Sequence, residues 1–186
     1  MIADRRRLRR DARAARAAFV ATLPPALRRA MEEALARHVL PLLAGASCVG
    51  AYAAAGSEID PIGIAGGGLR PLAFPRTVPA APLSFHQASF DSLAPGAHGI
   101  LEPPAHAPCV RPDVLLVPLL LFDRSGGRLG QGGGHYDRTL ASLRAEGPLL
   151  AIGLAWDMQE ADPLPLAPWD ERLDMVATPT RILDFR

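Results

Sequence analysis

Hydrophobic and polar positions follow two different periods along this chain. Leu8, Ala12, Ala15, Phe19 and Leu23 recur at spacings of four, three, four and four, which predicts an amphipathic helix over residues 2–22. Short apolar runs bounded by glycine or proline are typical of buried strands. On these patterns we also expect helices over 26–43 and 136–146, strands over 47–53, 69–77, 114–122, 149–156 and 175–178, and an edge strand at 82–89.

The order of these elements indicates the fold class. Strands alternate with helices, and the strands are continuous apolar runs, as expected for strands buried on both faces. We therefore predict an α/β fold, a three-layer sandwich in which helices cover both faces of a central, mostly parallel sheet, in one domain of residues 1–186. Ligands of such sheets bind outside the carboxyl ends of the strands.

Composition and charge narrow the function classes. The net charge is +1, so no strong overall field favours nucleic acid. No apolar run is long enough to span a bilayer, and residues 17–23 make a poor signal-peptide core, so we expect a cytoplasmic protein without a membrane partner. Cys48 and Cys109 lack metal-type spacing and are interpreted as reduced packing residues. His86, His98 and His106 lack ligand spacing as well.

A glycine loop, Gly130–Gly134, follows the apolar run 114–122 and precedes the predicted helix 136–146. A strand, a glycine loop and a helix in this order often bind phosphate. No Cβ blocks the backbone N–H groups, and the helix N-terminus adds positive potential. Arg128 and Arg138 flank the loop with cations that suit phosphate oxygens.

Two familiar phosphate motifs do not fit this loop. The P-loop needs a lysine and the chain contains none, whereas the dinucleotide fingerprint fails because its last glycine falls on His135. A glycine-rich surface loop or hairpin turn is the alternative interpretation. Asp137, just after the loop, could carry a metal ion.

Two further charged features depend on their context. Arg5, Arg9, Arg13 and Arg16 form a basic stripe at helical spacing, for which a solvated helix face is the simplest interpretation. Glu58 follows the predicted strand 47–53, at the edge where ligands bind, but taken alone it could equally be an ordinary loop acid or a charge at the start of a helix.

The central stretch carries a long, ungapped motif, which reads Pro118-x-x-x-Phe122-Asp123 and then Gly127-Arg128-Leu129-Gly130-x-Gly132-Gly133-Gly134-x-Tyr136-Asp137-Arg138. This motif resembles the signature of the 5-formyltetrahydrofolate cyclo-ligase family (5,10-methenyltetrahydrofolate synthetase). Weaker similarities add Gly56–Asp60, Gly99–Pro103, Ile152–Ala155 with Gln159, and Trp169–Asp174. The resemblance implies ATP-dependent closure of 5-formyltetrahydrofolate to 5,10-methenyltetrahydrofolate, with Mg²⁺ as cofactor and with release of ADP and phosphate.

The resemblance also implies a role for each matching residue. Asp137 and Arg138 are expected to be catalytic, and Asp137 and Asp170 to hold Mg²⁺. Glu58 is expected to orient the folate pterin and Ala53 to contact it. The residues expected to bind ATP are Arg5, Arg9, Arg128, Leu129, Gly130, Gln131, Gly132, Gly133, Gly134, His135 and Tyr136, of which Gln131, Gly132, Gly133, Gly134 and His135 are also expected to bind folate.

Three positions depart from the family pattern. Arg5 stands in place of a lysine, His135 in place of a tyrosine, and Trp169 in place of a histidine or asparagine before Asp170. These departures support one alternative, a non-catalytic paralogue that binds folate or nucleotide. A second alternative for the whole protein is a phosphosugar- or coenzyme A-binding enzyme of related α/β fold. For Asp170 and Asp174 alone, the alternative is that they are acids of a solvated loop. The expected partners are a reduced folate and ATP, and the expected state is a monomer or weak homodimer.

Overall fold

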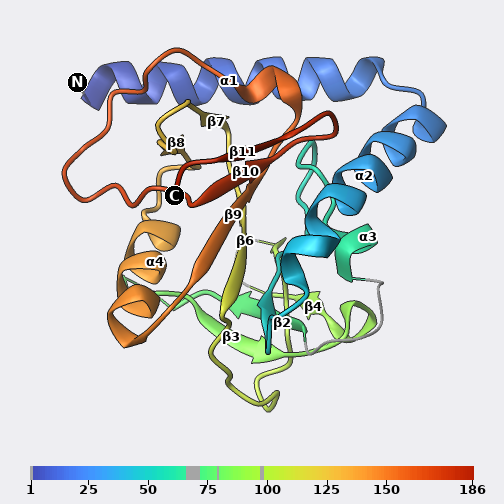
Figure 1. The fold of residues 1–186 in the computed structure, drawn as a ribbon, viewed down its shortest axis with the longest axis vertical. Helices are drawn as coiled ribbons and strands as arrows, with labels where there is room; N and C mark the ends of the chain where they lie inside the picture. Colours follow the sequence, from blue (N-terminus) through green and yellow to red (C-terminus); the bar gives the residue numbers. More distant parts are fainter. Residues whose placement is uncertain (1, 66–71, 79, 97–98) are drawn as a thin grey trace.

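The computed structural model describes residues 2–65, 72–78, 80–96 and 99–186 (Figure 1). Within these residues, seven strands form one sheet in the order β11-β10-β9-β6-β1-β2-β3. The five central strands run parallel, and the two edge strands, β3 and β11, are antiparallel to their neighbours. The strands are β1 Val49–Gly50, β2 Leu72–Arg76, β3 Ser84–Gln87, β6 Val114–Pro118, β9 Leu150–Leu154, β10 Met175–Ala177 and β11 Ile182–Asp184.

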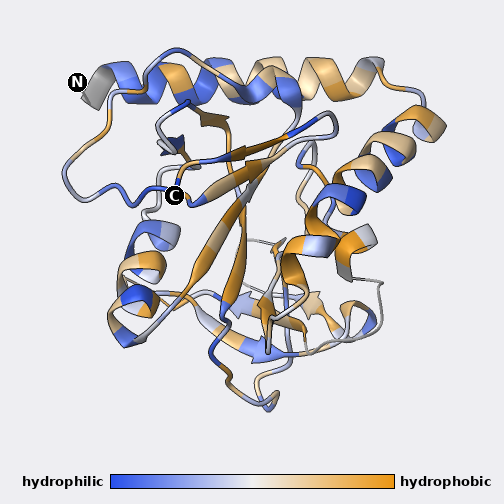
Figure 2. Cartoon of the chain, viewed as in Figure 1, coloured by the Kyte–Doolittle hydropathy of each residue, from blue (hydrophilic) through white to orange (hydrophobic). Residues whose placement is uncertain are grey.

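Helices cover both faces of this sheet, so the predicted three-layer α/β architecture is confirmed (Figure 1). α2 (Pro25–Val39) and α3 (Ile62–Ala65) pack on one face, where Leu35, Val39 and Ile64 join the side chains of the central strands. α4 (His135–Glu146) packs on the other face through Leu140 and Leu143. Figure 2 shows the central strands β6 and β9 as strongly hydrophobic, as strands buried on both faces must be.

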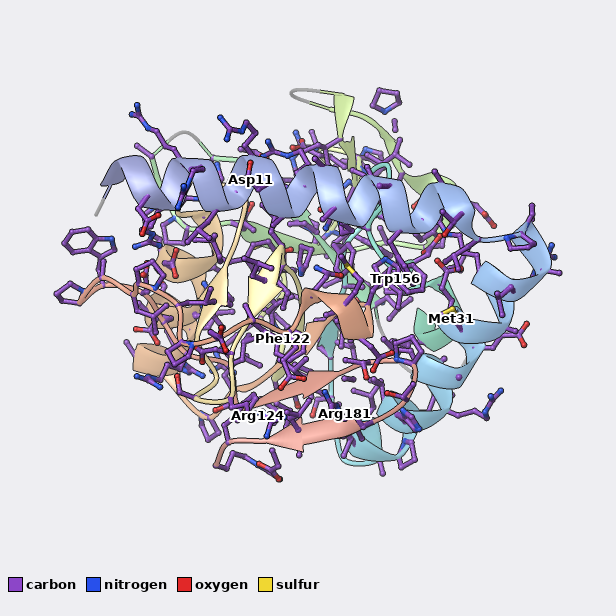
Figure 3. The ribbon with its side chains drawn as sticks, turned by 90° about the horizontal axis from the view of Figure 1, so that it is seen from above. Asp11, Met31, Phe122, Arg124, Trp156 and Arg181 are labelled. Atoms are coloured by element: carbon purple, nitrogen blue, oxygen red, sulfur yellow. The ribbon has the colours of Figure 1, made fainter. Side chains whose placement is uncertain are left out.

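α1 (Ile2–Thr22) belongs to neither layer, because it lies across the carboxyl ends of the parallel strands (Figures 1 and 3). Its hydrophilic N-terminal half is visible in Figure 2. Near its C-terminal half, the ring of Phe19 meets Trp156 edge-on, with ring centroids 5.8 Å apart. The helix is thereby fixed at the edge of the sheet where ligands of α/β proteins bind.

α1 has the predicted bounds and α4 begins one residue earlier than predicted, whereas the other predicted elements are recovered with shorter bounds. The helix expected over 26–43 is α-helical to Val39 and continues as a 3₁₀ turn, η1 (Leu40–Leu43), which contains Pro41. The strand expected over 47–53 is limited to β1, although the amide of Ala51 still donates to the carbonyl of Ala73 at 2.8 Å. The strand predicted over 149–156 loses three end residues, and the strand predicted over 175–178 loses one. Residues 66–71 and His98 lie outside the described residues.

The apolar run 114–122 is two strands, so the expectation of one continuous strand was wrong. β6 ends at Pro118, and β7 (Leu121–Phe122) forms a separate hairpin with β8 (Arg128–Leu129). Between them, the side-chain amide of Gln159 donates to the carbonyls of Leu119 (2.8 Å) and Leu120 (3.1 Å). Because a side chain supplies the donors for these two carbonyls, they do not need a neighbouring strand, and the backbone can leave the sheet at this point.

Smaller features complete the chain. β4 (Ala94–Pro95) pairs with β5 (Leu101–Glu102), while η2 (Phe90–Ser92) and η4 (Asp157–Gln159) are short 3₁₀ turns. Both cysteines are free; Cys48 is buried, but Cys109 is exposed, so its interpretation as a packing residue was wrong. No helix in the described part of the chain combines the length and the apolarity that crossing a membrane requires.

Candidate active site

The basic stripe of α1 makes four contacts with three separate loops at the carboxyl edge of the sheet. Arg5 and Arg9 are half-buried and Arg16 is buried, so these three do not form the solvated face that spacing alone favoured. Arg13 is exposed, as are Arg6, Arg7 and Arg10 on the same helix. The contacts in chain order are Arg5 Nη1 to Asp170 Oδ2 (2.8 Å), Arg9 Nε to Gly130 O (3.1 Å), Arg13 Nη2 to Gln131 Oε1 (2.6 Å) and Arg16 Nη1 to Leu119 O (3.0 Å).

Burial acts on two of these arginines. Desolvation lowers the pKa of Arg9, and the neighbouring positive charge of Arg5 adds to the effect. Desolvation also lowers the pKa of the buried Arg16, while Glu58 opposes the shift. Because a guanidinium stays protonated in proteins, both side chains bring positive charge into a partly dehydrated region, where it interacts strongly with an anion.

The glycine loop takes its shape from two residues with positive φ. Gly132 has φ of 104°, and a Cβ there would lie 3.3 Å from the guanidinium of Arg9. Gly134 has φ of 65° and is the N-cap of α4, without a side-chain cap. The first N–H groups of the helix therefore lack an intrahelical acceptor beside the pocket, the arrangement that binds anions.

Two carboxylates stand near this loop, each paired with an arginine. Asp137, in the first turn of α4, accepts a hydrogen bond at 2.7 Å from Arg128. Burial lowers the pKa of Arg128, and Asp137 counteracts that shift. Asp170 is held by Arg5 and accepts a further hydrogen bond from the amide of Ala167 at 2.6 Å. Asp170 is thus oriented despite the departure at Trp169.

Glu58 connects the far end of the pocket to the glycine loop. The residue is buried, and its Oε2 accepts from the amide of Ala55 at 3.0 Å. Its Oε1 lies 3.8 Å from Arg16 Nη2 and accepts from Gln131 Nε2 at 3.4 Å. Since Gln131 also accepts from Arg13, one amide side chain bridges the carboxylate and the basic stripe.

Arg138 supports the loop from the first turn of α4. It donates to the carbonyl of Gly133 at 3.0 Å and to that of Ala81 at 3.3 Å, and its Nη2 lies 3.4 Å from His135 Nδ1. These contacts tie the glycine loop to the segment before β3.

These groups, apart from Arg13 and Arg16, surround one pocket of about 850 Å³. Leu129 is the only expected site residue that does not line it, because this side chain is buried within β8. The expected residues that line the pocket are Arg5, Arg9, Ala53, Glu58, Arg128, Gly130, Gln131, Gly132, Gly133, Gly134, His135, Tyr136, Asp137, Arg138 and Asp170.

Sequence reasoning missed several other residues of the site. Tyr52 lies in the pocket wall, donates to the carbonyl of Ile59 at 2.7 Å, and has its pKa raised by burial and by Glu58. Glu102 is buried in the wall and accepts from the amide of Thr77 at 3.1 Å. The Gly99–Pro103 similarity was the available signal for Glu102. Tyr52 carried none beyond its place in an apolar strand.

The carboxylates of the pocket can be compared with the ligands that magnesium requires. No group of three or more His, Cys, Asp or Glu residues that could hold a metal occurs among the described residues. Mg²⁺ at nucleotide sites usually binds through one or two carboxylates and keeps its remaining ligands as water and phosphate oxygens. Asp137 and Asp170, which line the same pocket, could supply these one or two carboxylates to a Mg²⁺ that enters with a nucleotide. Arg5 contacts both oxygens of Asp170, so Asp170 would have to exchange one of these contacts for the ion.

The fold and the pocket define an α/β protein with a glycine loop and a helix N-terminus at the carboxyl edge of its sheet. The profile of the 5-formyltetrahydrofolate cyclo-ligase family matches residues 1–179. The chain belongs to the 5-formyltetrahydrofolate cyclo-ligase family.

Individual relatives carry the same name. The chain is 42% identical over 78 residues to the 5-formyltetrahydrofolate cyclo-ligase of Escherichia coli (strain K12), covering 42% of each protein. It is 37% identical over 103 residues to that of Haemophilus influenzae, covering 53% of this chain and 49% of the relative. The matched segments thus span about half the length of these relatives or less.

Solved structures match over a longer range. The NMR structure of Aquifex aeolicus 5,10-methenyltetrahydrofolate synthetase has a TM-score of 0.79 at 28% identity, covering 98% of this chain and 93% of that one. The 5,10-methenyltetrahydrofolate synthetase from Mycoplasma pneumoniae has a TM-score of 0.69 at 19% identity, covering 98% and 99%. This second likeness shows the fold alone.

Proposed function

We propose that this chain catalyses the ATP-dependent cyclisation of 5-formyltetrahydrofolate to 5,10-methenyltetrahydrofolate, with release of ADP and phosphate. One observation carries the proposal. A single pocket brings together a glycine loop at a helix N-terminus, a row of arginines, two carboxylates and the buried Glu58. Membership of the cyclo-ligase family supports the same reaction.

The reaction needs an activated oxygen rather than a nucleophilic residue. The formyl oxygen is a poor leaving group until the γ-phosphoryl group of ATP moves onto it and ADP departs. The second folate nitrogen then attacks the formyl carbon, loses its proton, and expels the oxygen as phosphate. The protein has to position two substrates and balance the charge of the moving phosphoryl group.

Residues at one end of the pocket suit the phosphates. Gly130–Gly134 offer backbone N–H groups, and Arg5, Arg9, Arg128 and Arg138 supply positive charge. Asp137 and Asp170 would hold Mg²⁺, which when bound would neutralise phosphate charge. Within the described residues, the hydrogen bonds of Asp137 all use Oδ1, so Oδ2 is open to a further ligand.

Residues at the other end suit the folate. Glu58 can accept from the amino and ring N–H groups of a pterin, and its low exposure strengthens such bonds. Ala53 and Tyr52 line the pocket beside it. The bridge from Glu58 through Gln131 would set the pterin and the phosphates at a fixed separation.

A spectroscopic assay tests the proposal. Purified protein is mixed with 5-formyltetrahydrofolate and Mg²⁺, and the near-ultraviolet band of the methenyl product is followed before and after ATP is added. We expect a rise that requires ATP. A flat trace from folded protein that binds ATP would contradict the proposal. Binding of folate or nucleotide without turnover would favour the non-catalytic paralogue, and binding of sugar phosphate or coenzyme A without folate would favour the other alternative.

Three expectations from the sequence stay predictions. These are the cytoplasmic location, the monomer or weak homodimer, and the organisation of residues 1–186 as one domain.

A further inference from the structure

Trp169 is the most exposed large hydrophobic side chain in the described part of the chain. Its exposed fraction is 74%, compared with 49% for the next, Leu27. Single exposed apolar residues are ordinary on protein surfaces. Trp169, however, also lines the pocket, beside Asp170. A wide aromatic surface is therefore presented to water at the edge of the site.

The backbone that carries Trp169 is held firmly. Residues 167–170 form a turn, closed by the amide of Asp170 donating to the carbonyl of Ala167 at 3.0 Å. The amide of Ala167 donates in return to Asp170 Oδ2 at 2.6 Å. Pro168 restricts the corner before the tryptophan. Arg5 on α1 also binds the Asp170 side chain. The exposed indole of Trp169 is therefore carried by a backbone turn that is held at Ala167 and at Asp170.

The basic stripe of α1 gives the position of Trp169 along the pocket. Arg5 contacts Asp170, next to Trp169, whereas Arg16 contacts Glu58. Eleven residues of α-helix separate these two arginines, a rise of roughly 16 Å. Trp169 therefore lies at the end of the pocket opposite the expected pterin site, with the glycine-loop contacts of Arg9 and Arg13 between them.

We propose that Trp169 stacks on the purine ring of the nucleotide and contributes to its selection; this inference rests on the proposed use of ATP. The γ-phosphoryl group must face the folate, so the base must lie at the other end of the nucleotide, beyond the phosphates. The indole occupies that end. Stacking on a base needs only a flat ring, and removing the aromatic ring weakens binding by about tenfold.

Acrylamide quenching of tryptophan fluorescence tests the contact without turnover. The chain has two tryptophans, and Trp156 is fully buried, so the quencher reports chiefly on Trp169. We expect MgATP to reduce quenching several-fold. Magnesium tripolyphosphate, which has the phosphates but no base, should leave quenching unchanged. If MgATP raises the melting temperature but leaves quenching unchanged, or if tripolyphosphate protects equally, the stacking is refuted.

Variants give a second readout. Trp169→Ala should raise KM for ATP about tenfold and leave kcat and KM for folate near their wild-type values. Trp169→Phe, which keeps an aromatic ring, should have a KM for ATP between those of wild type and Trp169→Ala. Met158→Ala removes an exposed side chain outside the pocket and serves as the control. A rise in KM for folate alone would overturn the assignment to the purine.

The two proposals can fail separately. If MgATP protects Trp169 from quenching but no methenyl product forms, the proposed ligase activity is wrong and the stacking proposal stands. If product forms but Trp169→Ala has an unchanged KM for ATP, the stacking proposal is wrong and the ligase activity stands. If MgATP neither protects Trp169 nor raises the melting temperature, both proposals are wrong.

Discussion

Arg5 grips both carboxylate oxygens of Asp170, with Nη1 2.8 Å from Oδ2 and Nη2 3.1 Å from Oδ1. The pair joins the first helix to the loop that follows η4, across most of the sequence. A guanidinium can hold two oxygens at once, whereas the ammonium of lysine is a point charge. Arginine at this position therefore supplies the orientation of Asp170 that its neighbour Trp169 cannot provide.

Replacing Arg5 with lysine should weaken the site although the charge is kept. We expect Arg5→Lys to raise KM for ATP by roughly three- to tenfold, because one of two charge-assisted hydrogen bonds is lost and Asp170 is freed to rotate. Arg6→Lys, at an exposed position one residue on, is the matched control. Equal kinetics for the two variants would show that the paired geometry does not matter for the nucleotide.

Loss of the ion pair between Asp137 and Arg128 should affect both turnover and stability. Asp137→Asn should lower kcat by about a hundredfold or more, the scale for losing one charged group that stabilises a phosphoryl transfer. It should also lower the free energy of unfolding by roughly 1–3 kcal/mol, because Arg128 is buried and loses its counter-ion. Single-turnover kinetics and urea unfolding measure the two effects.

Folate binding provides the control for that variant. Since the expected pterin contact is Glu58, Asp137→Asn should bind 5-formyltetrahydrofolate with near-normal affinity. Asp11→Asn, on the outer side of α1 (Figure 3), should change neither turnover nor stability. A parallel loss of folate binding in Asp137→Asn would indicate a collapsed site rather than a lost catalytic group.

The sequence predicted the parts of the site that follow from local pattern. The period of α1, the glycine loop and the carboxylates at the expected positions all came from spacing or from the family motif. Spacing could not show that Arg16 is buried while Arg13 is exposed, because both lie on the same stripe of one helix and burial depends on what packs against each of them. The hydrogen-bond partners of Arg16, which are Ser57 and Leu119, belong to two loops that are distant in the sequence.

The division of the run 114–122 shows a second limit. Every residue from Val114 to Phe122 except Pro118 is apolar and suited to a strand, so periodicity gave no reason to divide the run. Pro118, at which β6 ends, was the one local signal. The division depends on Gln159, which lies in the turn after the neighbouring strand β9 and whose side chain donates to the carbonyls of Leu119 and Leu120. A long-range hydrogen bond of this kind has no local signal.

The conformation of Gly132 predicts a specific cost of a methyl group. Gly132→Ala places a Cβ at φ of 104° and 3.3 Å from Arg9, so it should lower the free energy of unfolding by roughly 1–3 kcal/mol and raise KM for ATP. In Gly130→Ala the added Cβ meets nothing within 4 Å, and φ is not positive. This variant should therefore unfold at nearly the wild-type denaturant concentration. Equal destabilisation of the two variants would contradict the strain argument.

Asp123 predicts how stability depends on acidity. It is buried in the turn before β8, and its carboxylate accepts from Ser125 N (2.8 Å), Ser125 Oγ (2.6 Å), Gly127 N (3.0 Å) and Leu164 N (2.9 Å). Burial raises the pKa of Asp123, but these hydrogen bonds outweigh it, so the pKa lies below its ordinary value of 3.8. The charged form is therefore favoured in the folded state.

The sign of the effect follows from this lowered pKa. The unfolded chain takes up the proton first as the pH falls, so the contribution of Asp123 is complete above about pH 4 and is lost as the pH drops through the folded pKa. Asp123→Asn should be less stable than wild type by roughly 1–3 kcal/mol at pH 7, and the gap should narrow below pH 4. Urea unfolding from pH 7 to pH 3 measures it. Asp162→Asn, an exposed acid beyond the same hairpin, should track wild type throughout. A gap for Asp123→Asn that stays constant down to pH 3 would show that the hydrogen bonds do not favour the charged carboxylate.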